Sequence, residues 1–465
     1  MILALTLIEN LPTAEKVSQM NMTRRDIFGA TAVVGAAGFY EPVHAADVGS
    51  MLNGRTFGVE PNVAHDQSQA MQIAFDEAAR RGGHLFLEPG LYIASGLRIS
   101  SALNLSGVSG QTRIVQGKNE AIIKIEGTTG ARLVGLTFDG QHRNLGPDKA
   151  LVEANSVRGL VISNCHLANS SNNGINLTVC SGTVSETRVE ACANAGIFSL
   201  GARGLRMDGN LIANMGNNGI LVWQPTKHTD GTIITGNRIE RITARSGGSG
   251  QNGNGINVFR AGNVIVSNNQ ISDCAFTAVR NNSGSNAQII GNNCSRLGEV
   301  AIYSEFFAEG CLVANNLVDT AATGISITNF NEGGRLAVCQ GNIVRNLFIR
   351  KDPEDERAVG ISVEADTAVT GNVIEYAPTA GLWLGWGKHL RNISATTNVI
   401  QKCGIGISAS VVDGARTALI ANNIISGTKH GAILGMDHGR AVTGDLALAS
   451  PAVHGTLTIL GNVVS

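Results

Sequence analysis

The 465-residue sequence has few aromatic and few charged side chains: 4% are Phe, Trp or Tyr, and 15% are Asp, Glu, Lys or Arg. The formal net charge of -1 offers no excess of cations for phosphate contacts, so we expect no nucleic-acid partner. An ordinary globule of this length carries more large aromatic residues in its core. The shortage therefore favours a narrow interior filled by small aliphatic side chains.

The eight cysteines are scattered and lack the Cys-x-x-Cys spacing of a metal site. Cys192 and Cys274 each lie five residues before a recurring Ile or Val, which predicts small core residues rather than ligands. The ten histidines share no metal-binding spacing either. We therefore expect no metal, no cofactor and no obligatory disulfide framework.

The sequence is rich in an internal repeat. A small residue followed by an aliphatic one, usually Gly-Ile, returns from Gly174-Ile175 to Gly431-Ala432, most often every 22 or 23 residues. A period near 22 without helical spacing is typical of short strands that form coils stacked on one another. We predict an all-β fold, a single-stranded parallel β-helix (solenoid) of roughly 13 or 14 coils.

A recurring Asn is interleaved with the Gly-Ile pairs. We expect it at a turn that tolerates left-handed backbone, where stacked amides hydrogen-bond from coil to coil as a ladder. The predicted positions are Asn164, Asn210, Asn237, Asn268, Asn292, Asn315, Asn342, Asn372, Asn398 and Asn422.

The N-terminus has the features of an export signal. Arg24-Arg25 precedes the apolar run 29–39 and the small-x-small pattern that ends at Ala45. These features predict a twin-arginine signal over residues 1–45 that is cleaved after Ala45, with Met20 or Met22 as the real start. The twin-arginine export machinery is then a partner, and the mature protein is periplasmic or secreted and does not span a membrane.

A helix is predicted over Asp66–Arg81. Asp66 and Gln69 have the spacing of a capping box, and Gly82-Gly83 ends the helix. An apolar face would let this helix cover the open end of the solenoid. That face comprises Met71, Ala74, Phe75 and Ala78.

The segment 56–110 resembles the N-terminal part of pectate-lyase-like β-helix proteins. The resemblance is carried by Phe57-Gly58-Val59, Asp66, Gly82-Gly83 and the run Leu87-Glu88-Pro89-Gly90-Leu91-Tyr92. It implies a right-handed β-helix with an N-terminal capping helix and a polysaccharide substrate. The signal joined to these repeats also resembles twin-arginine-translocated alphaproteobacterial repeat proteins of uncharacterised function. We therefore divide the chain into a signal region (1–45), a cap with first coils (46–110) and β-helix repeats (111–465).

The catalytic motifs of the best-known relatives are missing from the sequence. It contains no Asp-Asp pair, as polygalacturonase-like hydrolases have, and no Asp-Pro-His, as alginate epimerases have. No calcium site of the pectate-lyase kind can be assembled from the coil strands. The pair Asp437-His438 is expected in a solvated turn.

Two intervals of the repeat are 36 residues long, and each carries about nine extra residues before a strand, at 246–254 and at 350–358. The same spacing recurs 105 residues later, which indicates an internal duplication. We expect both loops to overhang one face of the solenoid. The alternative is a pair of tolerated surface insertions.

The candidate site lies on that face. If the recurring Ile points inward, the next residue and the one two further on point outward. Flat rings beside amides would stack on sugar rings and hydrogen-bond their hydroxyls. The expected polysaccharide-binding residues are Asn176, Trp223, Asn257, Phe259, Asn282 and Trp383.

The expected catalytic residues are Arg280, Tyr303, Glu305 and Glu364. Arg280 would neutralise a substrate carboxylate while Tyr303 or Glu305 moves a proton, as elimination or epimerisation beside a uronate requires. Glu305 and Glu364, two coils apart, would instead suit the paired carboxyls of an inverting glycosidase. The alternative is a solvated charge ladder in which Arg280 and Glu305 only pair with each other.

Two classes of function remain from the sequence. One is a carbohydrate-active lyase, hydrolase or epimerase that binds a polysaccharide along the outward strands. The other is a non-catalytic cell-envelope or glycan-binding repeat protein, which the absence of a complete catalytic motif favours.

Overall fold

The structure is a computed structural model that describes residues 51–328, 334–351, 356–448 and 452–465. The predicted signal residues Arg24, Arg25 and Ala45 lie outside the described residues. The fold belongs to one compact unit, Gly49–Ser465.

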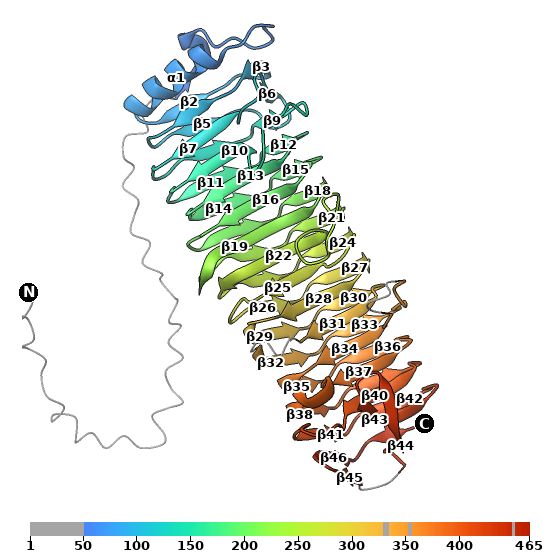
Figure 1. Ribbon diagram of the computed structural model, residues 1–465. Helices are drawn as coiled ribbons and strands as arrows, with labels where there is room; N and C mark the ends of the chain where they lie inside the picture. Colours follow the sequence, from blue (N-terminus) through green and yellow to red (C-terminus); the bar gives the residue numbers. More distant parts are fainter. Residues whose placement is uncertain (1–50, 329–333, 352–355, 449–451) are drawn as a thin grey trace, which may run out of the picture. The chain divides into compact units, whose positions relative to one another are not determined.

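The unit is an all-β parallel solenoid of three long sheets with 17, 15 and 15 strands (Figure 1). Each full coil gives one strand to each sheet in turn, as in β13 (Asn173–Thr178), β14 (Gly182–Ser185) and β15 (Arg188–Glu190). We call the sheets that contain β14, β15 and β13 sheets A, B and C, respectively. Among the described residues, neighbouring coils pair in parallel, and the two antiparallel pairs are hairpins near the C-terminus. The predicted β-helix is confirmed.

The remaining strands of sheet C are β4 (Leu97–Ile99), β7 (Ile123–Glu126), β10 (Ala150–Asn155), β16 (Ala195–Leu200), β19 (Asn218–Thr229), β22 (Asn254–Gly262), β25 (Val279–Asn282), β28 (Val300–Glu305), β31 (Thr323–Ile327), β34 (Val359–Val363), β37 (Ala380–Leu384), β40 (Ile405–Ser410), β43 (Gly431–Asp437) and β44 (Arg440–Asp445). Those of sheet B are β3 (Gly90–Ala94), β6 (Thr112–Gln116), β9 (Thr137–Asp139), β12 (His166–Ala168), β18 (Leu211–Met215), β21 (Arg238–Ile242), β24 (Gln270–Cys274), β27 (Asn293–Leu297), β30 (Leu317–Asp319), β33 (Ile343–Arg345), β36 (Val373–Glu375), β39 (Val399–Gln401), β42 (Ile424–Ser426) and β47 (Val463–Val464). Those of sheet A are β1 (Leu52–Asn53), β2 (His84–Phe86), β5 (Asn104–Ser106), β8 (Arg132–Val134), β11 (Leu160–Ser163), β17 (Leu205–Asp208), β20 (Ile233–Thr235), β23 (Ile265–Ser267), β26 (Gln288–Ile290), β29 (Glu309–Ala314), β32 (Arg335–Gln340), β35 (Ala365–Thr370), β38 (Arg391–Thr396), β41 (Ala418–Ala421), β45 (Ala452–His454) and β46 (Leu457–Leu460).

The recurring aliphatic residue of each coil points into the solenoid and is completely buried, as Ile197, Ile220 and Ile302 show. Full burial of one such side chain is worth about 1.5–3 kcal/mol. The residue before it must be small: a Cβ at Gly196 would lie 2.7 Å from Ile212 Cγ2, and Ala278 and Ala301 take this position in two other coils. All eight cysteines are buried free thiols, which confirms that they are core residues.

A ladder of buried Asn side chains follows the turn before sheet B. Each ladder residue donates two hydrogen bonds to the side-chain oxygen of the ladder residue in the next coil. For example, the backbone N–H and the Nδ2 of Asn292 both donate to Oδ1 of Asn316. Nδ2 also donates to a backbone carbonyl of the preceding coil, so each side-chain amide links three consecutive coils. The ladder residues are Asn210, Asn237, Asn269, Asn292, Asn316, Asn342, Asn372, Asn398, Asn423 and Asn462.

The sequence prediction assigned two properties to one Asn, and the structure divides them between two neighbouring positions. Asn268, Asn315 and Asn422 hold the left-handed turn with φ of 55°, 55° and 57°, and the ladder residue is the one that follows. Asn164 has the same turn conformation, but the next residue is Cys165, so the Asn ladder does not extend there.

The N-terminal end of the solenoid is covered by α1 (Ser68–Arg80), preceded by a short 3-10 helix, η1 (Gly54–Phe57). The predicted apolar face of α1 is buried in the main core. The predicted capping box is wrong: Gln67 is the N-cap residue and makes no side-chain cap bond, while Asp66 Oδ1 accepts from the N–H of Ser68. Figure 1 shows α1 lying across the first coils.

Candidate functional site

The candidate residues lie in two columns on the outer face of sheet C. Strand pairing places Arg280 of β25 directly beside Tyr303 of β28, and Asn282 beside Glu305. Period-2 alternation therefore located these side chains correctly on the coils. The other predicted residues stand on the same face: Asn176 on β13, Trp223 on β19, Asn257 and Phe259 on β22, Trp383 on β37, and Glu364 just after β34.

Arg280 and Glu305 form a two-point ion pair across adjacent coils. Arg280 Nε donates to Glu305 Oε1 at 2.6 Å and Nη2 donates to Oε2 at 2.8 Å. Asn282 Nδ2 donates to the same Oε1 at 2.9 Å. The side chains of Arg280 and Glu305 are only 8% and 2% exposed, so this pair is buried rather than a solvated ladder.

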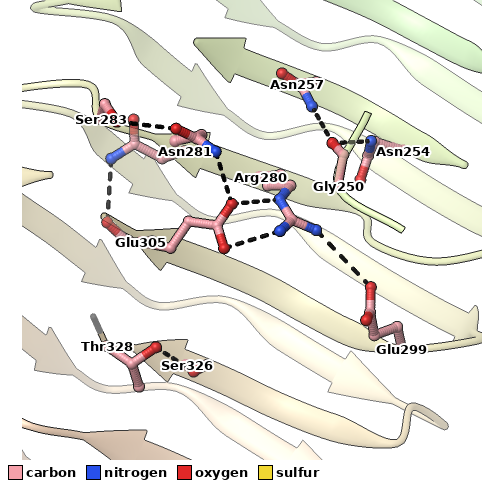
Figure 2. A network of polar contacts seen from close by, with 12 residues as sticks. Gly250, Asn254, Asn257, Arg280, Asn281, Ser283, Glu299, Glu305, Ser326 and Thr328 are labelled. Atoms are coloured by element: carbon pink, nitrogen blue, oxygen red, sulfur yellow. Dashed lines mark hydrogen bonds and ion pairs between the residues drawn. The ribbon is translucent and has the colours of Figure 1, made fainter. Parts of the chain in front are cut away.

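Burial raises the pKa of Glu305, and the bonds from Arg280 and Asn282 act in the opposite direction by favouring the charged carboxylate. Arg280 also lies over the ring of Tyr303, with 4.9 Å between its guanidinium carbon and the ring centroid. Arg280 therefore contacts both the carboxylate of Glu305 and the ring of Tyr303. Figure 2 shows Glu305 on one side of Arg280 and Glu299 on the other.

Glu299 extends the charged network to the second inserted loop. Its Oε2 lies 3.9 Å from Arg280 Nη1, too far for a hydrogen bond, and its Oε1 accepts from Arg350 Nη1 at 2.9 Å. Two arginines and two glutamates thus alternate from Glu305 to Arg350. Neither Glu299 nor Arg350 was predicted from the sequence, because neither belongs to an outward strand column.

Both inserted loops approach the same place, as the spacing predicted. A Cβ at Gly250 would lie 3.4 Å from Arg280 Nη2, and the carbonyl oxygen of Gly250 accepts from Asn257 Nδ2 at 2.9 Å. Phe276 lies next to both loops. A Cβ at Gly253 in the first loop would lie 2.3 Å from Phe276 Cδ2, and the guanidinium carbon of Arg350 in the second loop lies 5.7 Å from the centroid of the Phe276 ring. Gly250 of the first loop therefore covers Arg280, and Arg350 of the second loop reaches Glu299 beside it.

A cavity of ≈ 220 Å³ opens on the next coils of sheet C, beyond the buried pair. It brings together Tyr303, Glu364 and Trp383 of the predicted residues, whereas Arg280 and Glu305 do not line it. Hydroxyl groups form its polar lining, and Arg357 and Trp386 complete it. The full lining is Val300, Tyr303, Thr323, Ser326, Thr328, Arg357, Val359, Ser362, Glu364, Trp383 and Trp386.

Trp383 is more covered than expected for a stacking platform. It is 4% exposed because it packs in a small apolar cluster with Val359, Leu434 and Met436 outside the main core. Trp386, which was not predicted, is more open and lies 5.8 Å from Trp383 between ring centroids. The Arg357 guanidinium lies 4.7 Å from the ring of Trp386.

Asp437-His438, expected in a solvated turn, reaches the same cluster. The turn is exposed, but the His438 ring lies 5.3 Å from that of Trp386 in an edge-on arrangement. The His438 ring of this turn therefore packs against Trp386, which is itself next to Trp383.

A row of aromatic rings runs along sheet C on the N-terminal side. Trp223 lies 5.3 Å from Phe198 and 5.7 Å from Phe259 between ring centroids, both edge-on. Trp223 Nε1 donates to Asn257 Oδ1 at 3.2 Å, which fixes the indole. Asn176 lies further along, in a separate polar cavity with Lys124 and Glu153. The predicted binding residues therefore occupy one face but not one pocket.

Two family models match the sequence. The right-handed beta helix region matches residues 226–400, and the family described as periplasmic copper-binding protein (NosD) matches residues 105–296. The fold is accordingly a right-handed β-helix. No curated protein sequence matches the chain.

Solved structures with a similar fold include three at low sequence identity. The catalytic unit of a GH87 alpha-1,3-glucanase from Streptomyces thermodiastaticus is 17% identical over 90% of this chain and 69% of that one, with a TM-score of 0.49. The surface adhesin PfbA of Streptococcus pneumoniae is 15% identical over 83% and 91%, also with a TM-score of 0.49. Bacteriophage phi29 gene product 12 is 13% identical over 83% and 55%, with a TM-score of 0.47. These values carry no conclusion about function.

The described residues do not fit the copper that one family description names. Within residues 51–328, 334–351, 356–448 and 452–465, no three His, Cys, Asp or Glu side chains converge on one point. The thiols are in the core, and burial raises the pKa of Cys192 to about 12, which keeps it protonated. No helix in this part of the chain is long and apolar enough to cross a membrane.

Proposed function

We propose that this chain is an exported carbohydrate-binding protein that holds a polysaccharide along the outer face of sheet C, with one sugar unit in the cavity lined by Tyr303, Trp383 and Trp386. The observation that carries the proposal is the composition of that cavity. Two tryptophan side chains, four Ser or Thr residues, an arginine and a glutamate line this cavity of ≈ 220 Å³. Sugars present flat apolar faces and hydroxyls, which this lining matches.

Export is part of the proposal. It is supported by the arrangement of Arg24-Arg25, an apolar run and Ala45 in the sequence, and by the periplasmic description of one matching family. The twin-arginine machinery is the proposed export route, and the mature chain is proposed to be periplasmic or secreted.

The proposal is tested by titrating the mature protein with a panel of uronic-acid and neutral polysaccharides in a calorimeter. Trp386→Ala should weaken binding about tenfold, which corresponds to about 1.4 kcal/mol. Tyr376→Ala is the matched control, because Tyr376 is an exposed aromatic residue just after β36 of sheet B. If no polysaccharide of the panel binds, or if both variants lose the same affinity, the cavity is not the binding site.

A second candidate function is turnover of the bound sugar. Tyr303 and Glu364 line the same cavity, which supports them as the groups that move a proton. Arg280 and Glu305 are then positioning residues that hold the Tyr303 ring. The alternative without catalysis is a cell-envelope or glycan-binding protein that uses the same cavity.

A further inference from the structure

Sheet B carries an unusual outward column of side chains. The first residue of each short strand points away from the core and lies beside the first residue of the next strand. Over six consecutive coils this position is always aliphatic. These residues, which we call the aliphatic stripe, are Leu317, Ile343, Val373, Val399, Ile424 and Val463.

Four of the six stripe residues are exposed to solvent, and Leu317 and Val399 are partly buried. Ile343, Val373, Ile424 and Val463 are 44%, 38%, 50% and 61% exposed, although each could have been polar without disturbing the core. Other exposed apolar side chains, Phe348, Ile349 and Tyr376, lie on the segments that follow β33 and β36. Contiguous apolar surface of this kind marks an interaction site.

In the N-terminal half of the solenoid the same column is polar or charged at five of six positions, and Leu211 is the one aliphatic residue among them. There the corresponding residues are His166, Arg188, Leu211, Arg238, Gln270 and Asn293. The core of the coils is alike in both halves, so the requirements of the fold do not explain the change. An unbroken run of aliphatic residues at this position is therefore specific to the C-terminal coils.

We infer that the aliphatic stripe is an interface with a second copy of this chain, related by a two-fold axis parallel to the strands and placed between β36 and β39. Such an axis reverses the order of the coils. Val373 then faces Val399 of the other copy, Ile343 faces Ile424, and Leu317 faces Val463. All six side chains find an aliphatic partner, because the axis lies at the centre of the stripe.

The polar border of the stripe agrees with this pairing. Two residues after each stripe position comes an outward polar column with Asp319, Arg345, Glu375, Gln401 and Ser426. The two-fold axis places Glu375 opposite Gln401 and Arg345 opposite Ser426. Every charged side chain then meets an amide or hydroxyl group, and no like charges face each other.

The other border is formed by the turn residues two positions before the stripe, all of which have left-handed backbone. Gly341, Gly371 and Gly461 have no side chain there, whereas Asn315, Thr397 and Asn422 present polar side chains. The stripe spans five coil spacings, about 24 Å. A stripe that is one residue wide and about 24 Å long buries less surface than the roughly 1,200 Å² of stable complexes. We therefore expect a weak, concentration-dependent dimer.

Sedimentation velocity of the full chain over a range of concentrations tests the inference. The wild type should shift from monomer to dimer, and Val373→Asp or Val399→Asp should raise the dissociation constant at least tenfold while keeping the melting temperature. Leu211→Asp is the matched control, because Leu211 occupies the same column outside the stripe. A wild type that stays monomeric, or a control that dissociates equally, overturns the proposal.

Cross-linking tests the geometry. A mixture of Val373→Cys and Val399→Cys proteins should form disulfide-linked dimers on mild oxidation, whereas each variant alone should not. All eight native thiols are buried and do not interfere. If the wild type is monomeric but floats with lipid vesicles, and Val373→Asp abolishes flotation, the stripe binds lipid and the second-copy inference is wrong.

Discussion

Arg280 and Glu305, one coil apart on the outer face of sheet C, bind each other through two hydrogen bonds of 2.6 and 2.8 Å while almost completely buried. A buried charge without its partner is far more costly than an exposed one. Substitutions at this pair should therefore lower the stability of the fold, which can be measured separately from any loss of function.

Glu305→Ala should lower the free energy of unfolding by about 3–5 kcal/mol, because it leaves the guanidinium of Arg280 buried without its partner. Arg296→Ala is the control: it removes an exposed pair with Asp273, worth about 0–1 kcal/mol. Urea denaturation measures both. Equal, small effects of the two substitutions would show that solvent reaches Arg280.

Asn316→Ala should destabilise the protein by several kcal/mol, because both the backbone N–H and the Nδ2 of Asn292 lose their acceptor in the core. Asn315→Gly, one residue earlier, should stay within about 0.5 kcal/mol, because Asn315 holds a left-handed turn that Gly adopts readily. Thermal melts of the two variants decide the matter. Similar losses at both positions would contradict the division of roles between them.

Glu364→Gln and Tyr303→Phe should each lower turnover of any polysaccharide that the protein degrades by about 10²-fold, with little change in affinity, because each removes one of the two groups proposed to move a proton. Unsaturated products and reducing ends are the readout. Arg280→Ala and Glu305→Gln should also lower the rate, through displacement of Tyr303, and Lys402→Ala, just after β39 of sheet B, is a control. Undiminished turnover in the first two variants would leave the binding proposal without its catalytic extension.

Asp366 should stabilise the fold less at acidic pH than at neutral pH. The hydrogen bond from Arg391, 2.9 Å from Nε to Oδ2, lowers the pKa of this carboxyl. Its charged form therefore stabilises the fold above its ordinary pKa, and this stabilisation is lost as the pH falls below about 4 towards the lower folded-state value. The difference in denaturation midpoint between wild type and Asp366→Asn should shrink from pH 7 to pH 3. A constant difference would contradict the ion pair, and Asp208→Asn is the exposed control.

Replacement of Arg24 and Arg25 by Lys should leave the protein in the cytoplasm and its melting temperature unchanged, because both residues precede the folded unit. Cell fractionation measures this. Export of the double variant at the wild-type level would remove the twin-arginine prediction.

The sequence predicted the repeat well because its period is a property of neighbouring residues. Ile and Gly recur with the coil, so the placement of Arg280 beside Tyr303 followed from alternation alone. The Asn ladder was misplaced by one residue at Asn-Asn pairs such as Asn315-Asn316. Both residues of such a pair are Asn, and only the backbone conformation distinguishes them.

Burial on the outer face could not be predicted in the same way. Alternation shows which side a residue points to, but the covering groups come from distant segments: Gly250 and Glu299 beside Arg280, and Leu434 and Met436 beside Trp383. Such contacts depend on how loops fold back over the coils, and no local period encodes them.

The Asn ladder has a consequence for the history of this chain. Because each rung makes the same bonds to the coil before and the coil after, a whole coil can be copied or removed and the new neighbours still match. Recombination between coils then changes the length of the solenoid without creating an unsatisfied amide. The 105-residue spacing between the two 36-residue intervals agrees with growth by such copying, in which a loop and its supporting coils are inherited together.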